Sequence, residues 1–167
     1  MKLSKRGEYG LKALIDLASG WPERSAIQIK DIAQREQIPV KFLEQILLTL
    51  KNAGLLLSKV GSGGGYYLAK PPSEITLGQI VRVLDGPLAP IRCVSKMAYE
   101  RCVCTDEETC GLRLVMLDVR NAIADILDHT SLADVTARAE AARRTQEAQL
   151  LNDDRATPAG GELDVVS

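Results

Sequence analysis

Four cysteines are the residues of this chain whose type and spacing point most directly to chemistry. They are Cys93, Cys102, Cys104 and Cys110, in the pattern C-x8-C-x-C-x5-C, and the sequence contains no other cysteine. Thiolates in this number suit an iron–sulfur cluster, a structural zinc ion or a thiol–disulfide switch, while inert packing thiols are the remaining interpretation. The C-x2–4-C pairs typical of zinc sites are absent. The pattern therefore favours an iron–sulfur cluster, with zinc and disulfide chemistry as alternatives.

The elements around the cysteines must hold them in place. Residues 88–110 have low periodicity, and such long segments in compact domains are typically functional loops. A strong helical pattern follows over residues 111–129. Its apolar stripe consists of Leu112, Val115, Val119, Ile123 and Ile126. This is more apolar surface than one small domain can cover, so we expect the helix to pair with a second copy in a homodimer.

Residues 28–68 have the pattern of a winged helix-turn-helix, which presents one helix to the major groove of DNA. Apolar residues at helical spacing predict a short helix over residues 30–36 and a longer one over 40–53. Pro39 must end the first helix and is well placed in the first turn of the second.

A glycine loop follows the second of these helices. Residues 55–59 and 66–68 are predicted to be two strands, and the loop 61–65 between them is predicted to be the wing. Glycine loops also cradle nucleotide phosphates, but no Lys-Ser/Thr pair and no helix follow this one. An ordinary glycine hairpin is the alternative interpretation.

Further helices are predicted elsewhere along the chain. One spans residues 4–18, and a second is capped by Thr76 and runs to about Leu84. Ser131 is expected to cap one more short turn. Residues 137–151 contain helix formers with little apolar face, and residues 152–167 are expected to be a flexible tail.

These elements define a fold class that is mainly α with a small β-wing, a winged helix-turn-helix head joined to a long dimerisation helix. We expect a DNA-binding domain over residues 1–70. The cysteine loop and the dimerisation helix fall in residues 71–135, and a helical or disordered tail occupies residues 136–167.

Charge separates the predicted domains. Residues 1–70 contain 11 Lys and Arg against 6 Asp and Glu, a net charge of +5, whereas the remainder has 10 against 16, a net of −6. A basic head beside an acidic remainder indicates nucleic-acid binding by the head alone, rather than protein binding. One Phe and one Trp supply no stacking platform for single strands. Neither a signal peptide nor a membrane-spanning stretch is evident, so we expect a cytoplasmic protein with reduced thiols.

Several motifs in order carry a resemblance to a known family. They are Ser-Lys-Arg-Gly-Glu-Tyr-Gly from residue 4, Phe-Leu-Glu-Gln-Ile-Leu from residue 42, Gly-Ser-Gly-Gly-Gly-Tyr from residue 61 and Leu-Gly-Gln-Ile-Val from residue 77. With the cysteine loop and long helix, they resemble the IscR, NsrR and CymR family of bacterial transcription regulators (the Rrf-two family) over residues 1–135. The resemblance implies a dimer whose iron–sulfur cluster alters its binding to palindromic promoter DNA.

The resemblance also implies roles for particular residues. Family members use three cysteines, of which Cys93 and Cys110 match the first and last, and either Cys102 or Cys104 is the middle one. The extra cysteine is a candidate for the fourth ligand. Glu8 is its rival, because it falls where some relatives supply a carboxylate to the partner's cluster.

Candidate DNA contacts come from three parts of the head. Lys2 and Lys5 are candidates for phosphate contacts at the start. The second helix of the motif supplies Lys41, Phe42, Glu44, Gln45 and Lys51, of which the first four match groove-facing positions in the family. The wing supplies Lys59, Ser62 and Gly63, although Val60 stands where relatives often have Arg. Glu44 suits the N4 amino group of cytosine, and Gln45 suits adenine.

The functional hypothesis is a DNA-binding repressor that senses iron–sulfur, redox or nitric oxide status through its cluster, with 4Fe–4S preferred over 2Fe–2S. One alternative keeps the DNA-binding fold and gives the cysteines a zinc site or a thiol–disulfide switch. A further alternative is regulation by docking a metabolic enzyme. An enzyme or electron-transfer protein is not expected, because no His-rich or carboxylate constellation accompanies the cysteines.

Overall fold

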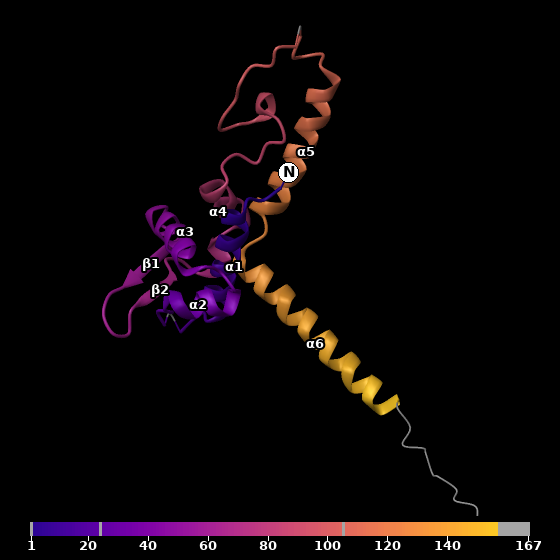
Figure 1. Cartoon of the computed structure of the whole chain (residues 1–167). Helices are drawn as coiled ribbons and strands as arrows, with labels where there is room; N and C mark the ends of the chain where they lie inside the picture. Colours follow the sequence, from indigo (N-terminus) through magenta and orange to yellow (C-terminus); the bar gives the residue numbers. More distant parts are fainter. Residues whose placement is uncertain (1, 24, 105, 157–167) are drawn as a thin grey trace, which may run out of the picture. The chain divides into compact units, whose positions relative to one another are not determined.

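The computed structural model describes residues 2–23, 25–104 and 106–156 of the chain (Figure 1). Over these ranges it contains six α-helices and one two-stranded sheet, which confirms a mainly α fold with a small β-wing. Two compact units are distinguished, residues 1–136 and residues 137–167. Each helix in the described ranges is too short or too polar to span a membrane. The predicted boundary near residue 70 stays a prediction.

The head packs three helices around one apolar core: α1 (Lys5–Ser19), α2 (Ile29–Glu36) and α3 (Val40–Asn52). Its most deeply buried side chains are Leu14, Ile32, Leu43, Ile46, Leu47, Leu50, Leu56, Ile75, Ile80 and Leu132. Because these residues come from both ends of the first unit, one core ties the helix-turn-helix to the elements that follow it.

The turn between α2 and α3 is fixed by local backbone chemistry. Gln37 adopts the left-handed conformation with φ 55° and ends α2, while Pro39 is the N-cap of α3. Between them, Ile38 is buried and its N–H donates to the carbonyl of Ala33 at 2.9 Å. The prediction that Pro39 separates two helices is confirmed.

The wing is an antiparallel hairpin of β1 (Leu56–Lys59) and β2 (Gly65–Leu68). Ile27 extends it through two hydrogen bonds with Tyr66, of 3.0 and 2.9 Å. A Cβ at Gly65 would lie 2.2 Å from the carbonyl oxygen of Ile27, so only glycine fits this close approach. Gly65 is therefore required for the attachment of the wing to the head and not only for its turn.

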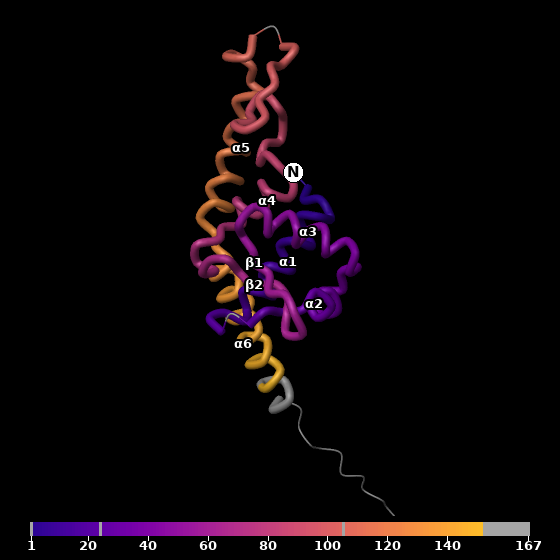
Figure 2. The backbone as a smooth tube through the Cα atoms, turned by 90° about the vertical axis from the view of Figure 1, so that its left-hand side faces the viewer, coloured from indigo at the N-terminus to yellow at the C-terminus, as the bar shows by residue number. Residues whose placement is uncertain are grey.

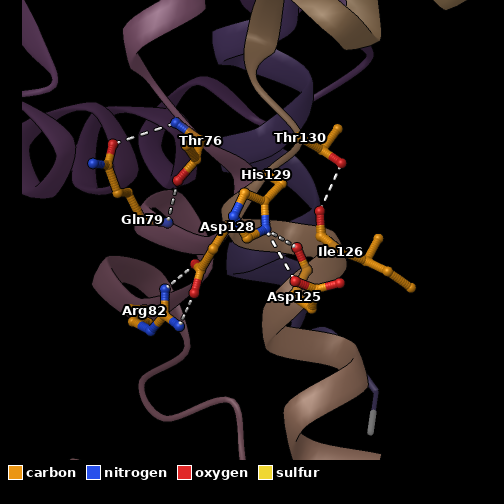
Figure 3. Close-up of polar contacts among 8 residues, drawn as sticks. All are labelled: Thr76, Gln79, Arg82, Asp125, Ile126, Asp128, His129 and Thr130. Carbon is orange, nitrogen blue, oxygen red and sulfur yellow. Dashed lines mark hydrogen bonds and ion pairs between the residues drawn. The ribbon is translucent and has the colours of Figure 1, made fainter.

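Helix α4 (Leu77–Leu84) begins at the predicted cap. The hydroxyl of Thr76 accepts from the N–H of Gln79, and the side chain of Gln79 accepts from the N–H of Thr76, both at 3.3 Å (Figure 3). A Cβ at Gly10 of α1 would lie 2.1 Å from a methyl carbon of Leu84, so α1 and α4 pack closely. The capping box of Thr76 and Gln79 fixes the start of α4, the helix that joins the head to the cysteine loop at residues 88–110.

The long helix α5 (Gly111–Asp128) runs beside the loop that contains the cysteines (Figures 1 and 2). Two short 3-10 turns interrupt the irregular segments, η1 (Pro72–Glu74) and η2 (Arg92–Val94). The last turn of α5 is joined to α4 by a bidentate ion pair, in which Arg82 donates to the two carboxylate oxygens of Asp128 at 2.5 and 2.8 Å (Figure 3). A Cβ at Gly78 would lie 1.9 Å from one of these oxygens, so the ion pair needs glycine beneath it.

The C-terminal prediction was wrong in one respect. Ser131 begins not a short turn but α6 (Leu132–Ala156), a helix of 25 residues that is longer than α5. The hydroxyl of Ser131 accepts from the N–H of Asp134 at 3.1 Å, and the N–H of Ser131 donates to the Asp134 carboxylate at 2.8 Å. Residues 152–156 are helical rather than part of a flexible tail, whereas the predicted tail over 157–167 lies outside the described residues.

Candidate nucleic-acid interface and cysteine site

Helix α3 divides its side chains between two faces. The face toward the core buries Leu43, Ile46, Leu47 and Leu50. The opposite face exposes all the side chains of α3 that were predicted to contact DNA, namely Lys41, Phe42, Glu44, Gln45 and Lys51. A helix with one face held by the core and the other open to solvent is the arrangement that a groove-binding helix needs.

Two of these exposed side chains also have partners within the head. The ring of Phe42 packs edge-on against Tyr9 of α1, with centroids 5.8 Å apart, so it contributes packing as well as a surface. Lys51 donates to the hydroxyl of Ser58 on β1 at 2.7 Å. The hydrogen bond joins the end of α3 to the wing and sets the position of one surface relative to the other.

The loop of the wing is open to solvent. Lys59, Ser62 and Gly63 are exposed, and Val60 is 93% exposed. A Cβ at Gly63 would meet nothing within 4 Å, in contrast to Gly65. The tip of the wing is thus free to approach another molecule closely.

The start of α1 places three predicted site residues together. Lys2 and Lys5 are exposed, and Lys5 pairs with Glu8 at 2.8 Å. The hydrogen bond from Lys5 lowers the pKa of the Glu8 carboxyl. Glu8 lines a pocket with Asp85, whereas the cysteines line a different one. Glu8 is therefore not brought to the cysteines of its own chain.

The structure does bring the four cysteines together. Cys93, Cys102, Cys104 and Cys110 line one pocket of about 30 Å³ beside the start of α5. Cys93 is buried in η2, Cys104 is exposed, and Cys110 immediately precedes α5. The long loop thus folds back so that thiols far apart in sequence face the same space.

Hydrogen bonding between thiols makes their acidities unequal. Cys102 has a lowered pKa because its thiolate accepts a hydrogen bond from Cys104, and the pKa of Cys104 is raised to about 12 by the same bond. Burial raises the pKa of the Cys93 thiol. The Cys102–Cys104 pair therefore supplies a thiolate more readily than the buried Cys93 does.

Two residues at this pocket were missed in the sequence. Glu107 accepts from the N–H of Cys102 at 2.5 Å and from the hydroxyl of Tyr99 at 2.7 Å, which closes the loop on itself. Arg113 also lines the pocket, and the Nε of its side chain is buried without a hydrogen-bond partner. Arg113 lies three residues after Cys110, and residues at this spacing share one face of a helix. This spacing could have identified it from the sequence.

The donor set suits a thiophilic metal group, since four cysteines line one pocket. The arrangement is not yet that of a ligated centre, because no group of three or more His, Cys, Asp or Glu side chains in the described ranges is placed to hold a metal ion. His129 lies apart, with its Nδ1 2.8 Å from the carbonyl oxygen of Asp125. Ligation of a cluster would require the exposed loop to close further around the pocket.

Comparisons with known proteins identify the family to which the chain belongs. The model of the Rrf2 family, described as "Iron-dependent Transcriptional regulator", matches residues 3–138. An Rrf2-like HTH-type transcriptional regulator of Rhodobacter capsulatus is 38% identical over 148 residues, which cover 87% of this chain and 99% of that protein.

Two solved structures have the same fold. The first is CymR, named the global cysteine regulator of B. subtilis, with a TM-score of 0.69 and 35% identity over 83% of this chain and 98% of that one. The second is IscR of T. potens, with a TM-score of 0.68 and 34% identity over 85% of this chain and 90% of that one. All these proteins are regulators and not enzymes, as expected. The chain belongs to the Rrf2 family of transcriptional regulators.

Proposed function

We propose that the chain is a homodimeric repressor of transcription that binds palindromic promoter DNA and responds to iron–sulfur, redox or nitric oxide status through a cluster held by its cysteines. The observation that carries the proposal is the meeting of all four cysteines at one pocket next to the helix that leads back to the DNA-binding head. Zinc would also use these sulfurs, and metal analysis separates the two.

The proposed DNA interface is the exposed face of α3, the wing tip and the start of α1. The residues assigned to it are Lys2, Lys5, Lys41, Phe42, Glu44, Gln45, Lys51, Lys59, Ser62 and Gly63, and all of them are exposed. The lysines would neutralise phosphates, and Glu44 and Gln45 would contact base edges. The net charge of +5 on residues 1–70 supports this assignment.

The proposed dimer interface is the outer face of α5. Leu112, Val115, Val119 and Ile126 are between 39% and 64% exposed on this helix. A contiguous apolar stripe of this kind favours burial against a second copy. A two-fold dimer also presents two heads to two half-sites of a palindrome.

The proposed ligands of the cluster are Cys93, Cys110 and one or both of Cys102 and Cys104, with Glu8 of a second copy as a rival fourth ligand. When bound, an iron–sulfur cluster supplies a redox-sensitive group that oxygen or nitric oxide can modify. The chain's own contribution is the loop closed by Glu107, which holds the sulfurs beside α5. Closing or opening this loop would move α5 and, through the Arg82–Asp128 ion pair, α4 and the head.

An absorption spectrum of protein purified without oxygen tests the proposal, with iron and acid-labile sulfide measured on the same sample. We expect a brown protein with matched iron and sulfide, both lost in Cys110→Ala, while Cys104→Ser separates a three-cysteine site from a four-cysteine site. A colourless protein that contains zinc, or no metal after anaerobic reconstitution, would contradict the cluster.

A thiol–disulfide switch is the second candidate, favoured by the hydrogen bond between the thiols of Cys104 and Cys102. Hydrogen peroxide would oxidise one thiol to the sulfenic acid with release of one water, and the second thiol would then displace a second water to form the disulfide, so that the peroxide is reduced to two molecules of water. Intact mass under non-reducing conditions would then fall by about 2 Da, and Cys102→Ser would abolish the change. A mass that stays constant after peroxide treatment would exclude this candidate.

A further inference from the structure

Arg120 is a buried cation for which the described ranges of the chain supply no partner. Its side chain is on α5, it is only 9% exposed, and it is the one residue of that helix that is buried. Its Nε is buried without a hydrogen bond, and no carboxylate in the described part of the chain forms an ion pair with it. A buried guanidinium without an anion carries a desolvation cost, which a bound anion would offset.

A pocket of about 260 Å³ lies beside Arg120. It is lined by residues of α4, the start of the cysteine loop and α5, which all belong to the first unit, and it opens to solvent. The Arg82–Asp128 ion pair forms part of its wall (Figure 3). The volume is near the lower end of the range for small-molecule sites and fits a ligand of only a few carbon atoms.

The polar groups around the pocket favour an anion. Of the two carboxylates that line it, Asp128 is paired with Arg82, and Asp125 is a largely exposed side chain that lies 3.2 Å from the Nδ1 of His129 and pairs with it only when the imidazole is protonated. Four of the polar groups that line the pocket can donate hydrogen bonds. They are the guanidinium of Arg120, the ammonium of Lys96, the amide of Asn121 and the hydroxyl of Ser95, which accepts from the N–H of Ala98 at 2.9 Å and keeps its own proton to donate.

The rest of the pocket is apolar. Pro87, Leu88, Ala89, Met97 and Ala124 supply its carbon surface. An inorganic anion would leave this surface without contacts, whereas a short carbon chain would cover it. The lining therefore matches a molecule with a charged end and an apolar end.

We propose that this pocket binds a small organic carboxylate, with its carboxylate on Arg120 and Lys96 and its carbon chain against the apolar wall. The site is separate from the pocket of the cysteines, so the chain has a second input. That the ligand would also alter DNA binding is an inference that rests on the proposed function. Because the ligand would sit between α4 and α5, it would stabilise one arrangement of the head relative to the long helix.

Binding is tested on the full-length protein without DNA, which keeps it independent of the proposed function. Butyrate is the probe for the organic carboxylate and inorganic phosphate is the probe for a simple anion. Arg120→Met removes the charge at similar volume, and Arg143→Met at an exposed position of α6 is the matched control. The measurements are the unfolding temperature and the 15N resonance of the Arg120 Nε–H during titration.

We expect butyrate to bind with a dissociation constant on the order of 1 mM, as suits six non-hydrogen atoms. It should raise the unfolding temperature and shift the Arg120 resonance, and phosphate should do so at least about tenfold less effectively. Arg120→Met should unfold at a higher temperature than the wild type without ligand, because it removes an unpaired buried charge, and should lose the response to butyrate. Arg143→Met should respond like the wild type.

Three outcomes would overturn the proposal. The first is the absence of a saturable shift with butyrate in the wild type. The second is an equal response of wild type and Arg120→Met. The third is that Arg120→Met dissociates the dimer while butyrate has no effect on the wild type. That result would mean that Arg120 pairs with a carboxylate of a second copy.

Discussion

Helices α3 and α5 use their apolar residues in opposite ways. The 13-residue α3 buries Leu43, Ile46, Leu47 and Leu50 within its own chain, whereas the 18-residue α5 buries only Arg120. Four apolar side chains that share one face of α5 at helical spacing are instead exposed to solvent, namely Leu112, Val115, Val119 and Ile126. The comparison shows that α3 is packed within its own chain, whereas α5 leaves an apolar face open, and it is for α5 and residues 88–110 that we propose a second copy, a cluster and an anion as further components.

The largest expected effect contrasts these two helices directly. Leu50→Ala should lower the free energy of unfolding by about 3 kcal/mol, because the side chain is fully buried and leaves a cavity. Leu112→Ala, at a side chain that is 63% exposed, should change the unfolding of the monomer by less than about 0.5 kcal/mol. Urea denaturation at low protein concentration measures both.

The same two variants should also differ in dimer formation at high protein concentration. Leu112→Ala should raise the dissociation constant of the dimer in sedimentation equilibrium, whereas Leu50→Ala should act through folding. If Leu112→Ala unfolds the monomer as strongly as Leu50→Ala does, the proposed division between the two regions is wrong.

The next effect on stability concerns Gly78, which lies beneath the Arg82–Asp128 ion pair that joins α4 to α5. Gly78→Ala should lower the free energy of unfolding by roughly 1–2 kcal/mol, although alanine normally favours a helix, because the added methyl group would displace the Asp128 carboxylate. Gly63→Ala, where a Cβ meets open space, is the control and should have almost no effect. Thermal unfolding followed by circular dichroism compares the two. A stabilised Gly78→Ala protein would mean that the ion pair moves freely.

A smaller effect concerns pH. The Arg82 guanidinium holds the pKa of the Asp128 carboxyl below its usual value, so the pair stabilises the fold above pH 4 and this contribution is lost as the pH falls through the lowered pKa. Asp128→Asn should cost about 0.5–1 kcal/mol at pH 7, since the pair is partly exposed, and little at pH 2–3. Urea unfolding at pH 7, 4 and 3 measures this. A constant cost across the series would exclude the ion pair as its source.

The smallest effect is on DNA binding by the head. Lys41→Ala should reduce the slope of log affinity against log salt concentration by about 1, with a similar loss on every sequence, if Lys41 contacts a phosphate. Gln45→Ala should instead relax base preference at one position and leave the slope unchanged. Fluorescence anisotropy on an operator obtained by in vitro selection distinguishes them. An unchanged slope for Lys41→Ala would remove this lysine from the interface.

The elements of the head could be predicted from the sequence because their determinants are local. Pro39 separates α2 from α3, and Thr76 caps α4 through a residue three positions away. Helix α6 was underestimated because its apolar periodicity is weak, although its alanines, arginines and glutamates favour a helix. Hydrophobic patterning therefore found the packed helices and missed the extent of an exposed one.

The candidate site could be predicted only in part. The four cysteines were identifiable from their types alone, and the structure places them at one pocket. Two interactions could not be identified from the sequence. The hydrogen bond between Glu107 and Cys102 depends on how a loop folds, and the ion pair between Arg82 and Asp128 joins residues that are 46 positions apart. Arg120 was missed because an arginine in a helical pattern is usually on the exposed face.

Hydrogen exchange followed by mass spectrometry would show whether a bound cluster completes residues 88–110 and α5, on full-length protein before and after anaerobic reconstitution with iron and sulfide. We expect α1, α3 and the wing to be protected to the same degree in both states, while residues 88–110 and the start of α5 gain protection only after reconstitution. Equal protection of residues 88–110 in both states would contradict the claim that this region is completed by a bound cluster.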